Sequence, residues 1–191
     1  MAVIGLRYPV WAPYASGGSG AAIVYGTPVT DAHAIEANIS WNRNENNLYA
    51  DDTIVEYDNS IMSGTISLMI DNLSAAMKAS MLGMTETGAG TGVYEDSDAA
   101  APHGGFGYIK VIRSGGTTSY EAYWIHDVVF TLGDESAKTR GANIEWQTPA
   151  ITGQINGVLL DETGVYKFRQ MSPETDYDDA VSFIDTIAGV T

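Results

Sequence analysis

The stretch FGYIKVIRSGGTTSYEAYWIHDVVFT, residues 106–131, decides the fold class of this chain. Two runs rich in aromatic and β-branched residues flank Ser114–Thr117, whose two glycines can adopt the positive φ that a tight reversal needs. The second run alternates, and its more apolar face contains Tyr120, Ala122, Trp124, His126, Val128 and Phe130. Its other face is not fully polar. The stretch therefore predicts an antiparallel hairpin whose second strand meets neighbours on both faces.

Alternating segments on both sides of this hairpin predict further strands. In residues 32–42 one face contains His33, Ile35, Ala37, Ile39 and Trp41, and polar residues occupy the other. In residues 62–70 the apolar face contains Met62, Gly64, Ile66, Leu68 and Ile70, and the other face is rich in hydroxyl groups. Residues 142–155 and 157–171 predict two or three more strands, with Pro149 at an edge or a bend.

Two segments have helical spacing instead. The first follows Asp71–Asn72 as N-cap and ends at Gly83, with a stripe of Leu73, Ala76, Met77 and Met81. The second predicts Ser172 at the N-cap and Pro173 at the first helical position, with a stripe of Tyr177, Ala180, Val181 and Ile184.

The remaining segments are rich in glycine, proline or acids. Residues 1–20 begin with aromatic and proline residues and end in SGGSG, which predicts an N-terminal arm. Residues 42–60 are polar and acidic and are predicted to form a long loop, and residues 85–105 a mobile one. We therefore expect one β-sandwich domain over 21–171, followed by a C-terminal helix or arm over 172–191.

The predicted fold class is mainly β. The order of elements shows no alternation of strands and helices, so we expect an antiparallel sandwich or barrel of seven or eight strands. One helix flanks it, a short helix follows at the C-terminus, and an N-terminal arm and a long stacking loop complete the chain.

Composition narrows the function classes. The chain has 191 residues and no cysteine, so disulfide and thiolate chemistry are excluded, and its formal charge of -15 opposes adhesion to nucleic acid or anionic membranes. No run approaches the roughly 20 apolar residues that cross a bilayer, and the N-terminus lacks the layout of a secretory signal. The sequence predicts synthesis in the cytoplasm and no membrane partner.

No motif predicts catalysis, a cofactor or a metal site. The glycines of 88–92 lack the strand, helix and lysine of a phosphate loop, and Glu95, Asp96 and Asp98 lack the glycine and distant glutamate of a calcium loop. His126 lies on an apolar strand face, where a buried, hydrogen-bonded histidine is the commoner role. We therefore expect a protein that is not an enzyme.

Half of the chain resembles a known family. The run NLYADDTIVEYDNSIMSGTISLMIDNLSAAMKASMLG, residues 47–83, is similar to the pattern of the major tail proteins, or tail tube proteins, of long-tailed, non-contractile bacteriophages. Residues 105–113 and 120–130, followed by 139–141 and 144–149, resemble the hairpin and the following strands of the same family.

The resemblance implies a virion protein made in the host bacterial cytoplasm. It implies a β-sandwich subunit that forms hexameric rings, which stack into the tail tube by exchanging arms and a long loop. It also implies partners, namely the tape-measure, tail-terminator and tail-tip proteins, and DNA only in transit through the lumen during ejection. An acidic, hydroxyl-lined wall lets DNA slide, because a basic wall would hold its phosphates.

Two sets of residues follow from this interpretation. The lumen-facing candidates are Glu36, Asn38, Ser40, Ser63, Thr65, Ser67, Glu121 and Asp127. The inter-ring contact candidates are Tyr8, Trp11, Tyr14, Leu48, Tyr49, Asp51, Asp52, Ile54 and Tyr57. A register slip of one residue would reverse every assignment to a face.

Other functions stay open at this stage. One is another virion or secretion-tube structural protein, such as a capsid decoration protein. A second is a calcium-dependent carbohydrate-binding module, suggested by the acidic composition, 11 tyrosines and 4 tryptophans on a β-sandwich. A hydrolase with an unrecognised carboxylate pair has no positive sign in the sequence.

Overall fold

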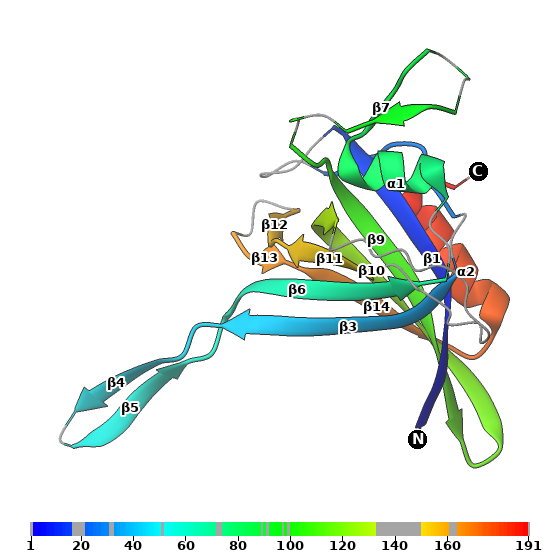
Figure 1. Ribbon diagram of the computed structural model, residues 1–191. Coiled ribbons are helices and arrows are strands. Elements are labelled where there is room, and N and C mark those ends of the chain that lie inside the picture. Colours follow the sequence, from blue (N-terminus) through cyan, green and yellow to red (C-terminus); the bar gives the residue numbers. More distant parts are fainter. Residues whose placement is uncertain are drawn as a thin grey trace, which may run out of the picture.

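A computed structural model gives the arrangement of the elements (Figure 1). It describes residues 2–16, 22–30, 33–50, 52–71, 74–88, 90, 92–96, 98, 100–132, 150–160 and 164–190. Within these residues, an eight-stranded antiparallel sheet has the order β2-β1-β9-β10-β11-β6-β3, and β14 also pairs with β10. Its strands are β1 (Ala2–Ser16), β2 (Val24–Tyr25), β3 (Ala34–Arg43), β6 (Ile61–Ile70), β9 (His103–Ser114), β10 (Thr117–Leu132), β11 (Ala150–Ile155) and β14 (Arg169–Glu174). The predicted mainly β, sandwich-like class is confirmed.

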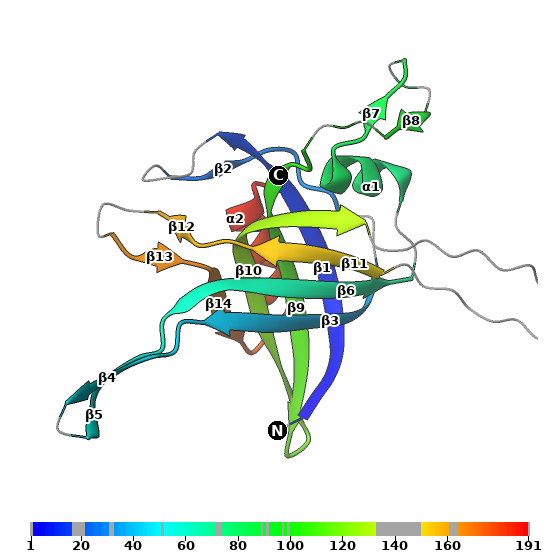
Figure 2. The same ribbon diagram turned by 60° about the vertical axis from the view of Figure 1, so that its left-hand side comes forward.

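The hairpin that decides the fold is confirmed as β9 and β10, with Gly115 and Gly116 at positive φ in its turn. Strand β10 belongs to two layers. Its residues 120–125 pair with β14, its residues 128–132 pair with β11, and the register shifts between Ile125 and Val128. One layer therefore holds β1, β9, β10 and β14, and the other holds the end of β10 with β11, β6 and β3 (Figure 2).

The shift in β10 corrects the predicted apolar face. Ala122 and Trp124 pack in one core with the C-terminal helix, whereas Val128 and Phe130 pack in the other core between the layers. A bulge inserts an extra residue and so exchanges the two faces of a strand. The prediction of one apolar face from Tyr120 to Phe130 is therefore wrong. Side chains on both faces of β10 are nevertheless buried, as expected.

Two apolar cores hold these layers together. The larger contains Trp11, Ile66, Leu68, Ile70, Met77, Met81, Phe106, Tyr108, Tyr123, Ile125, Val128, Phe130, Ile151 and Ile155. The smaller lies under the C-terminal helix and contains Val10, Ala12, Ile109, Ala122, Trp124, Ala180, Ile184 and Ala188. The sheet is thus covered by the second layer on one face and by a helix on the other.

The predicted N-terminal arm is wrong for residues 2–16. They form strand β1, which pairs with β9 along most of its length and with β2 at its end, and Val10, Trp11 and Ala12 are fully buried. Burial of these side chains outweighs the signal of the proline and glycine residues nearby. Residues 17–20 of the expected arm lie outside the described residues.

Helix α1 (Ala75–Leu82) ends as predicted at Gly83, which has φ 74, but it begins later than expected. Its N-cap is Ser74, whose hydroxyl accepts a hydrogen bond from the Met77 backbone N–H at 3.2 Å. Met77 and Met81 are buried as predicted, but Ala79 replaces Ala76 on the buried stripe. The stripe residue Leu73 lies outside the described residues.

Helix α2 (Tyr177–Ala188) carries the predicted stripe, since Ala180 and Ile184 are buried with Tyr177 and Val181 against them. Its predicted start is wrong. Ser172 and Pro173 belong to β14, and the N-cap is Asp176, whose side chain accepts from the Asp178 N–H. Proline is tolerated there because β14 pairs with β10 on one side only in the described sheet.

Two predicted loops contain strand pairs instead. Residues 46–58 form a hairpin of β4 (Asn46–Ala50) and β5 (Thr53–Asp58), and residues 85–95 contain β7 (Thr85–Glu86) and β8 (Tyr94–Glu95). A third short pair joins β12 (Val158–Leu159) to β13 (Tyr166–Lys167). Most of the predicted strand 142–155, residues 142–149, lies outside the described residues. No helix in the described part of the chain is long and apolar enough to span a membrane.

Candidate functional site

The outer face of the β3–β6–β11 layer is a continuous polar surface. Residues that are directly opposite in an antiparallel ladder project from the same face of the sheet. Asn38 lies opposite Ser67, which lies opposite Thr152, and the next row joins Ser40, Thr65 and Gln154. The alternate residues face the core between the layers, where Ile66 and Leu68 are fully buried and Ala37, Ile39 and Trp41 are partly buried. We call this surface the polar face.

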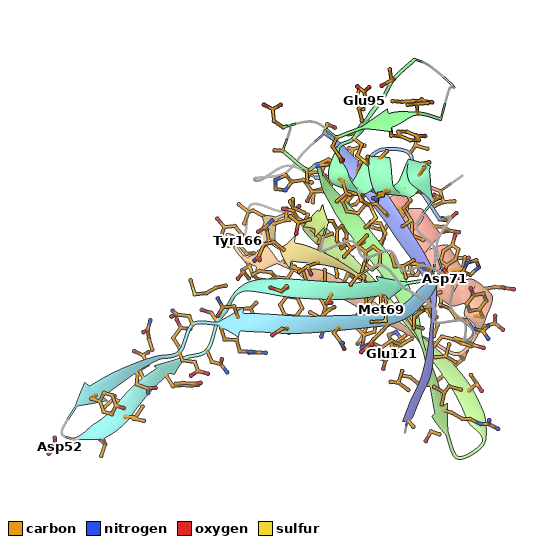
Figure 3. The ribbon with its side chains drawn as sticks, in the orientation of Figure 1. Asp52, Met69, Asp71, Glu95, Glu121 and Tyr166 are labelled. Atoms are coloured by element: carbon orange, nitrogen blue, oxygen red, sulfur yellow. The ribbon has the colours of Figure 1, made fainter. Side chains whose placement is uncertain are left out.

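The polar face carries many hydroxyl groups and little charge. Its described members include Glu36, Asn38, Ser40, Asn42, Ser63, Thr65, Ser67, Met69, Thr131, Ala150, Thr152 and Gln154, with Val129 and the nearly buried Asp127 at its rim. Glu36 and Asp127 are the ionisable side chains of this set, and Glu36 Oε1 accepts a hydrogen bond from Asn38 Nδ2 at 2.7 Å. The face therefore offers hydrogen-bonding groups without a positive charge to bind an anion. Figure 3 labels Met69 toward the end of β6 that leads to Asp71.

Six of the eight residues selected from the sequence as lumen-facing lie together on this face. They are Glu36, Asn38, Ser40, Ser63, Thr65 and Ser67. Alternation was sufficient here because β3 and β6 keep one register from Glu36 to Asn42.

The other two selected residues, Glu121 and Asp127, lie on β10. Glu121 is half-buried in the stretch that pairs with β14, and its Oε2 accepts a hydrogen bond from Tyr123 at 2.8 Å. It does not join the polar face, because the alternation of β10 was assumed to continue through the bulge. Asp127 lies on the same side of β10 as Val129 and Thr131, at the rim of the polar face, but it is only 7% exposed.

Asp127 belongs to a polar cluster at this rim, in which Asp127 is nearly buried and His103 is exposed. Its carboxylate oxygens lie 2.8 and 3.0 Å from His103 Nδ1, and Asn156 Nδ2 donates to Oδ2 at 3.3 Å. The Asn156 backbone N–H also donates to the Asp127 carbonyl. These hydrogen bonds give partners to polar groups that would otherwise be unpaired at the bulge.

His126, the neighbouring residue, is buried. Its carbonyl accepts hydrogen bonds from the hydroxyls of Tyr14 and Tyr25, each at 3.0 Å. Burial, with a smaller contribution from Lys167, lowers the pKa of His126 to about 4. The imidazole is therefore neutral at neutral pH, which fits the structural role expected from the sequence.

The members of the polar face that sequence reasoning missed include Thr131, Thr152 and Gln154. The signal was present, since Thr152 and Gln154 alternate with Ile151 and Ile155 in AITGQI. It was not used because the pairing of β11 with β6 cannot be read from either strand alone.

The hairpin of β4 and β5 is a second exposed feature and projects from the body beyond the ends of β3 and β6 (Figures 1 and 3). It carries Tyr49, Ile54 and Tyr57 from the inter-ring set, and they are 63%, 56% and 55% exposed. Asp52 is exposed at its tip, with a positive φ of 59. The side chains of Leu48 and Asp51 lie outside the described part.

The three N-terminal members of the inter-ring set are held within the fold. Trp11 is fully buried and its Nε1 donates to Ser80 Oγ at 3.1 Å. The Tyr8 hydroxyl donates to Asp185 at 2.7 Å, and the Tyr14 hydroxyl to the carbonyl of His126. Trp11 is a core residue and not a contact between copies, so this prediction was wrong.

The fold and these two features define a class, namely a mainly β sandwich protein with an exposed polar sheet face and a projecting hairpin. The chain gives no match to any family model and none to a curated protein. We therefore infer function from the residues themselves.

Proposed function

We propose that the chain is a structural subunit that self-assembles into stacked rings and so forms the tail tube of a long-tailed, non-contractile bacteriophage. The polar face lines the lumen. Three further parts of the proposal follow from the family resemblance of residues 47–83 and of segments within 105–149. They are the rings of six, the location in the virion, and the tape-measure, terminator and tail-tip partners. No catalytic role is assigned to any residue.

The observation that carries the proposal is the composition of the polar face. In a chain with a formal charge of -15, this sheet face presents mainly hydroxyl and amide groups, and its described members include Glu36 and the nearly buried Asp127 but no lysine or arginine. Duplex DNA binds proteins mainly through lysine and arginine contacts to its phosphates. A wall without such cations gives passing DNA nothing to hold.

The projecting hairpin supports self-assembly. Large apolar side chains exposed on an element that stands away from the body mark an interaction surface. Tyr49, Ile54, Val55 and Tyr57 are all more than half exposed on this hairpin. Contact with another copy would cover them.

Negative-stain electron microscopy of the purified protein at low and high concentration tests the proposal. The comparison is a variant in which a short glycine-serine turn replaces residues 46–58. We expect hollow tubes or stacked rings from the native chain and none from the variant. Truncation of residues 1–20 is unsuitable for this purpose, because β1 is part of the core.

Isolated trimers would indicate a decoration protein instead. A chain that remains monomeric at all concentrations, also after addition of preformed tail tips, would contradict the proposal.

A further inference from the structure

The hairpin of β4 and β5 lacks a partner within the described part of the molecule. The two strands pair with each other and form a separate two-stranded sheet. An isolated two-stranded hairpin has marginal stability in water. Its exposed tyrosine, isoleucine and valine side chains therefore need a surface on another molecule.

The charge of the hairpin limits what that surface can be. Residues 45–58 contain five acids, namely Glu45, Asp51, Asp52, Glu56 and Asp58, and no lysine or arginine. Asp58 is engaged locally, since it accepts hydrogen bonds from Asn44 and Ser60. Asp52 and Glu56 are exposed. A matching surface combines apolar or aromatic groups with positive charge.

A pocket of about 410 Å³ on the body has this character. The described residues that line it include Leu6, Arg7, Pro9, Thr30, His33 and Tyr177, with no carboxylate among them. The guanidinium carbon of Arg7 lies 5.8 Å from the centroid of the Tyr177 ring. The pocket thus presents an arginine beside an aromatic ring, the residue types that dominate binding at protein interfaces.

An irregular stretch of backbone near Arg7 shapes this pocket. The register of β1 against β9 shifts between Arg7 and Val10, and Tyr8 adopts a positive φ of 54, which is unfavourable for a residue with a side chain. The hydrogen bond from Tyr8 to Asp185 holds this conformation at 2.7 Å. As a result Arg7 is exposed while Pro9 is buried beside it.

The hairpin and the pocket lie at opposite ends of the β3–β6 ribbon. Figure 3 labels Asp52 at the hairpin tip and Asp71 at the other end of β6. His33, which lines the pocket, has its Nδ1 3.7 Å from Asp71 Oδ2. A chain cannot bring these two features together within itself, but two copies can. Complementary patches at opposite ends give a head-to-tail contact, which generates rings or filaments.

We propose that this pocket is the socket for the hairpin of a second copy of the chain, with Arg7 facing the carboxylates of the hairpin. The proposal rests on the tail-tube function proposed above and names the surface that receives the hairpin. Tyr49 and Ile54 supply the apolar contact, and Asp52 and Glu56 supply the charge.

Cross-linking tests the contact directly, because the chain has no cysteine of its own. The variant Thr30→Cys/Thr53→Cys carries one thiol at the pocket and one beside the hairpin tip. A short bis-maleimide should link it into a ladder of dimers, trimers and longer species. The control Thr53→Cys/Ser182→Cys, with its second thiol exposed on α2, should give no ladder.

Charge reversal provides a second test. Arg7→Glu and the hairpin variant Asp52→Lys/Glu56→Lys should each raise the concentration for half-assembly about tenfold or more in sedimentation velocity. An equimolar mixture of the two should recover assembly, because reversed hairpins meet reversed pockets and native hairpins meet native pockets. Circular dichroism melting curves check that each variant folds.

The outcomes separate this proposal from the previous one. Tubes that form without the Thr30→Cys/Thr53→Cys ladder would overturn the socket and leave the tail-tube function standing. A ladder in head-to-tail oligomers that never become tubes would support the socket and remove the tail tube. A mixture that assembles no better than its components, or monomers without cross-links, would overturn the socket.

Discussion

Glycine residues in β9 make room for the tryptophans that build both cores. A Cβ atom placed on Gly104 would lie 2.5 Å from Trp11 Cη2 and 2.6 Å from the Ala12 carbonyl oxygen. A backbone oxygen cannot move aside without breaking the β1–β9 ladder. Gly5 in β1 differs, since the nearest atom to its Cβ would be Val111 Cγ2 at 3.9 Å.

We therefore predict that Gly104→Ala lowers the free energy of unfolding by about 1–3 kcal/mol through overpacking. Gly5→Ala should change it by less than about 1 kcal/mol, in the stabilising direction, because alanine restricts the unfolded chain. Urea denaturation of both variants measures the difference. Equal effects at the two positions would contradict the close packing of Trp11.

His126 gives a prediction about pH. Its pKa is lowered to about 4 in the folded protein, against an ordinary value of 6.5 for histidine. Between these values the unfolded chain binds a proton that the folded chain does not, so stability falls as the pH is lowered from 6.5 toward 4. The loss should approach about 3 kcal/mol.

Denaturant titrations at a series of pH values measure this loss. His126→Gln should flatten the dependence in this range, because it removes the group whose pKa is lowered by burial. An unaltered pH profile in His126→Gln would assign the effect to another group.

For single residues, the sequence predicted correctly which face of the sheet a side chain occupies wherever the strand keeps its register. Six polar residues of β3 and β6 were assigned to one face by alternation, and the structure places them there. Glu121 was assigned wrongly because the bulge that follows it in β10 has no signature in the alternation itself. The bonds that stabilise the bulge come from Tyr14, Tyr25, His103 and Asn156, which are distant in the sequence.

Among the elements, β3 and β14 are joined across the two layers by a stack of cations and aromatic rings. The guanidinium carbon of Arg169 lies 5.4 Å from the ring centroid of Trp41 and 5.2 Å from that of Tyr123. Lys110 Nζ also contacts the Tyr123 ring, at 4.6 Å from its centroid. Trp41 also packs edge-on against Phe168.

Arg169→Ala should lower the free energy of unfolding by about 1 kcal/mol, since it removes cation–π contacts with two rings. Arg113→Ala, at an exposed arginine near the end of β9, should cost less than about 0.5 kcal/mol. A double-mutant cycle of Arg169→Ala with Trp41→Leu measures the coupling. No coupling would mean that the rings and the cation contribute independently.

The hairpin of β4 and β5 should be dispensable for folding. Because its described strands pair only with each other, replacement of residues 46–58 by a short turn should shift the Tm by no more than about 2 °C. Differential scanning calorimetry of dilute protein tests this expectation. A large drop in Tm would show that the hairpin packs against the body.

The sequence predicted the β9–β10 hairpin and both helices, and it failed on the arm and the long loop. Glycines at a turn and a helical stripe are local signals. The burial of Trp11 in β1 depends on β9, which follows it by about ninety residues in the chain. Polar residues in 46–58 resembled a loop because a hairpin that leaves the body has no buried face to alternate against.

For the whole molecule, the proposed tube makes a prediction about access. Ser67→Cys places a single thiol on the polar face, and Ser182→Cys places one on the exposed side of α2. In monomers both thiols should react with a maleimide attached to a bulky polymer. In assembled tubes the reaction of Ser67→Cys should be largely abolished, and that of Ser182→Cys should persist.

Equal reactivity of the two thiols in tubes would place the polar face on the outside and would remove the proposed lumen. The sequence supported a sandwich and a self-assembling function through local similarity. It could not supply the arrangement of the polar face, the hairpin and the pocket on one body, because that arrangement follows from long-range strand pairing.

Strand β10 has a mechanical consequence. It pairs with β9 on one side, and on the other it passes from β14 to β11 at the bulge near His126. The two layers therefore share one continuous strand, and a force that separates them acts along the covalent backbone of β10 as well as on the hydrogen bonds around the bulge.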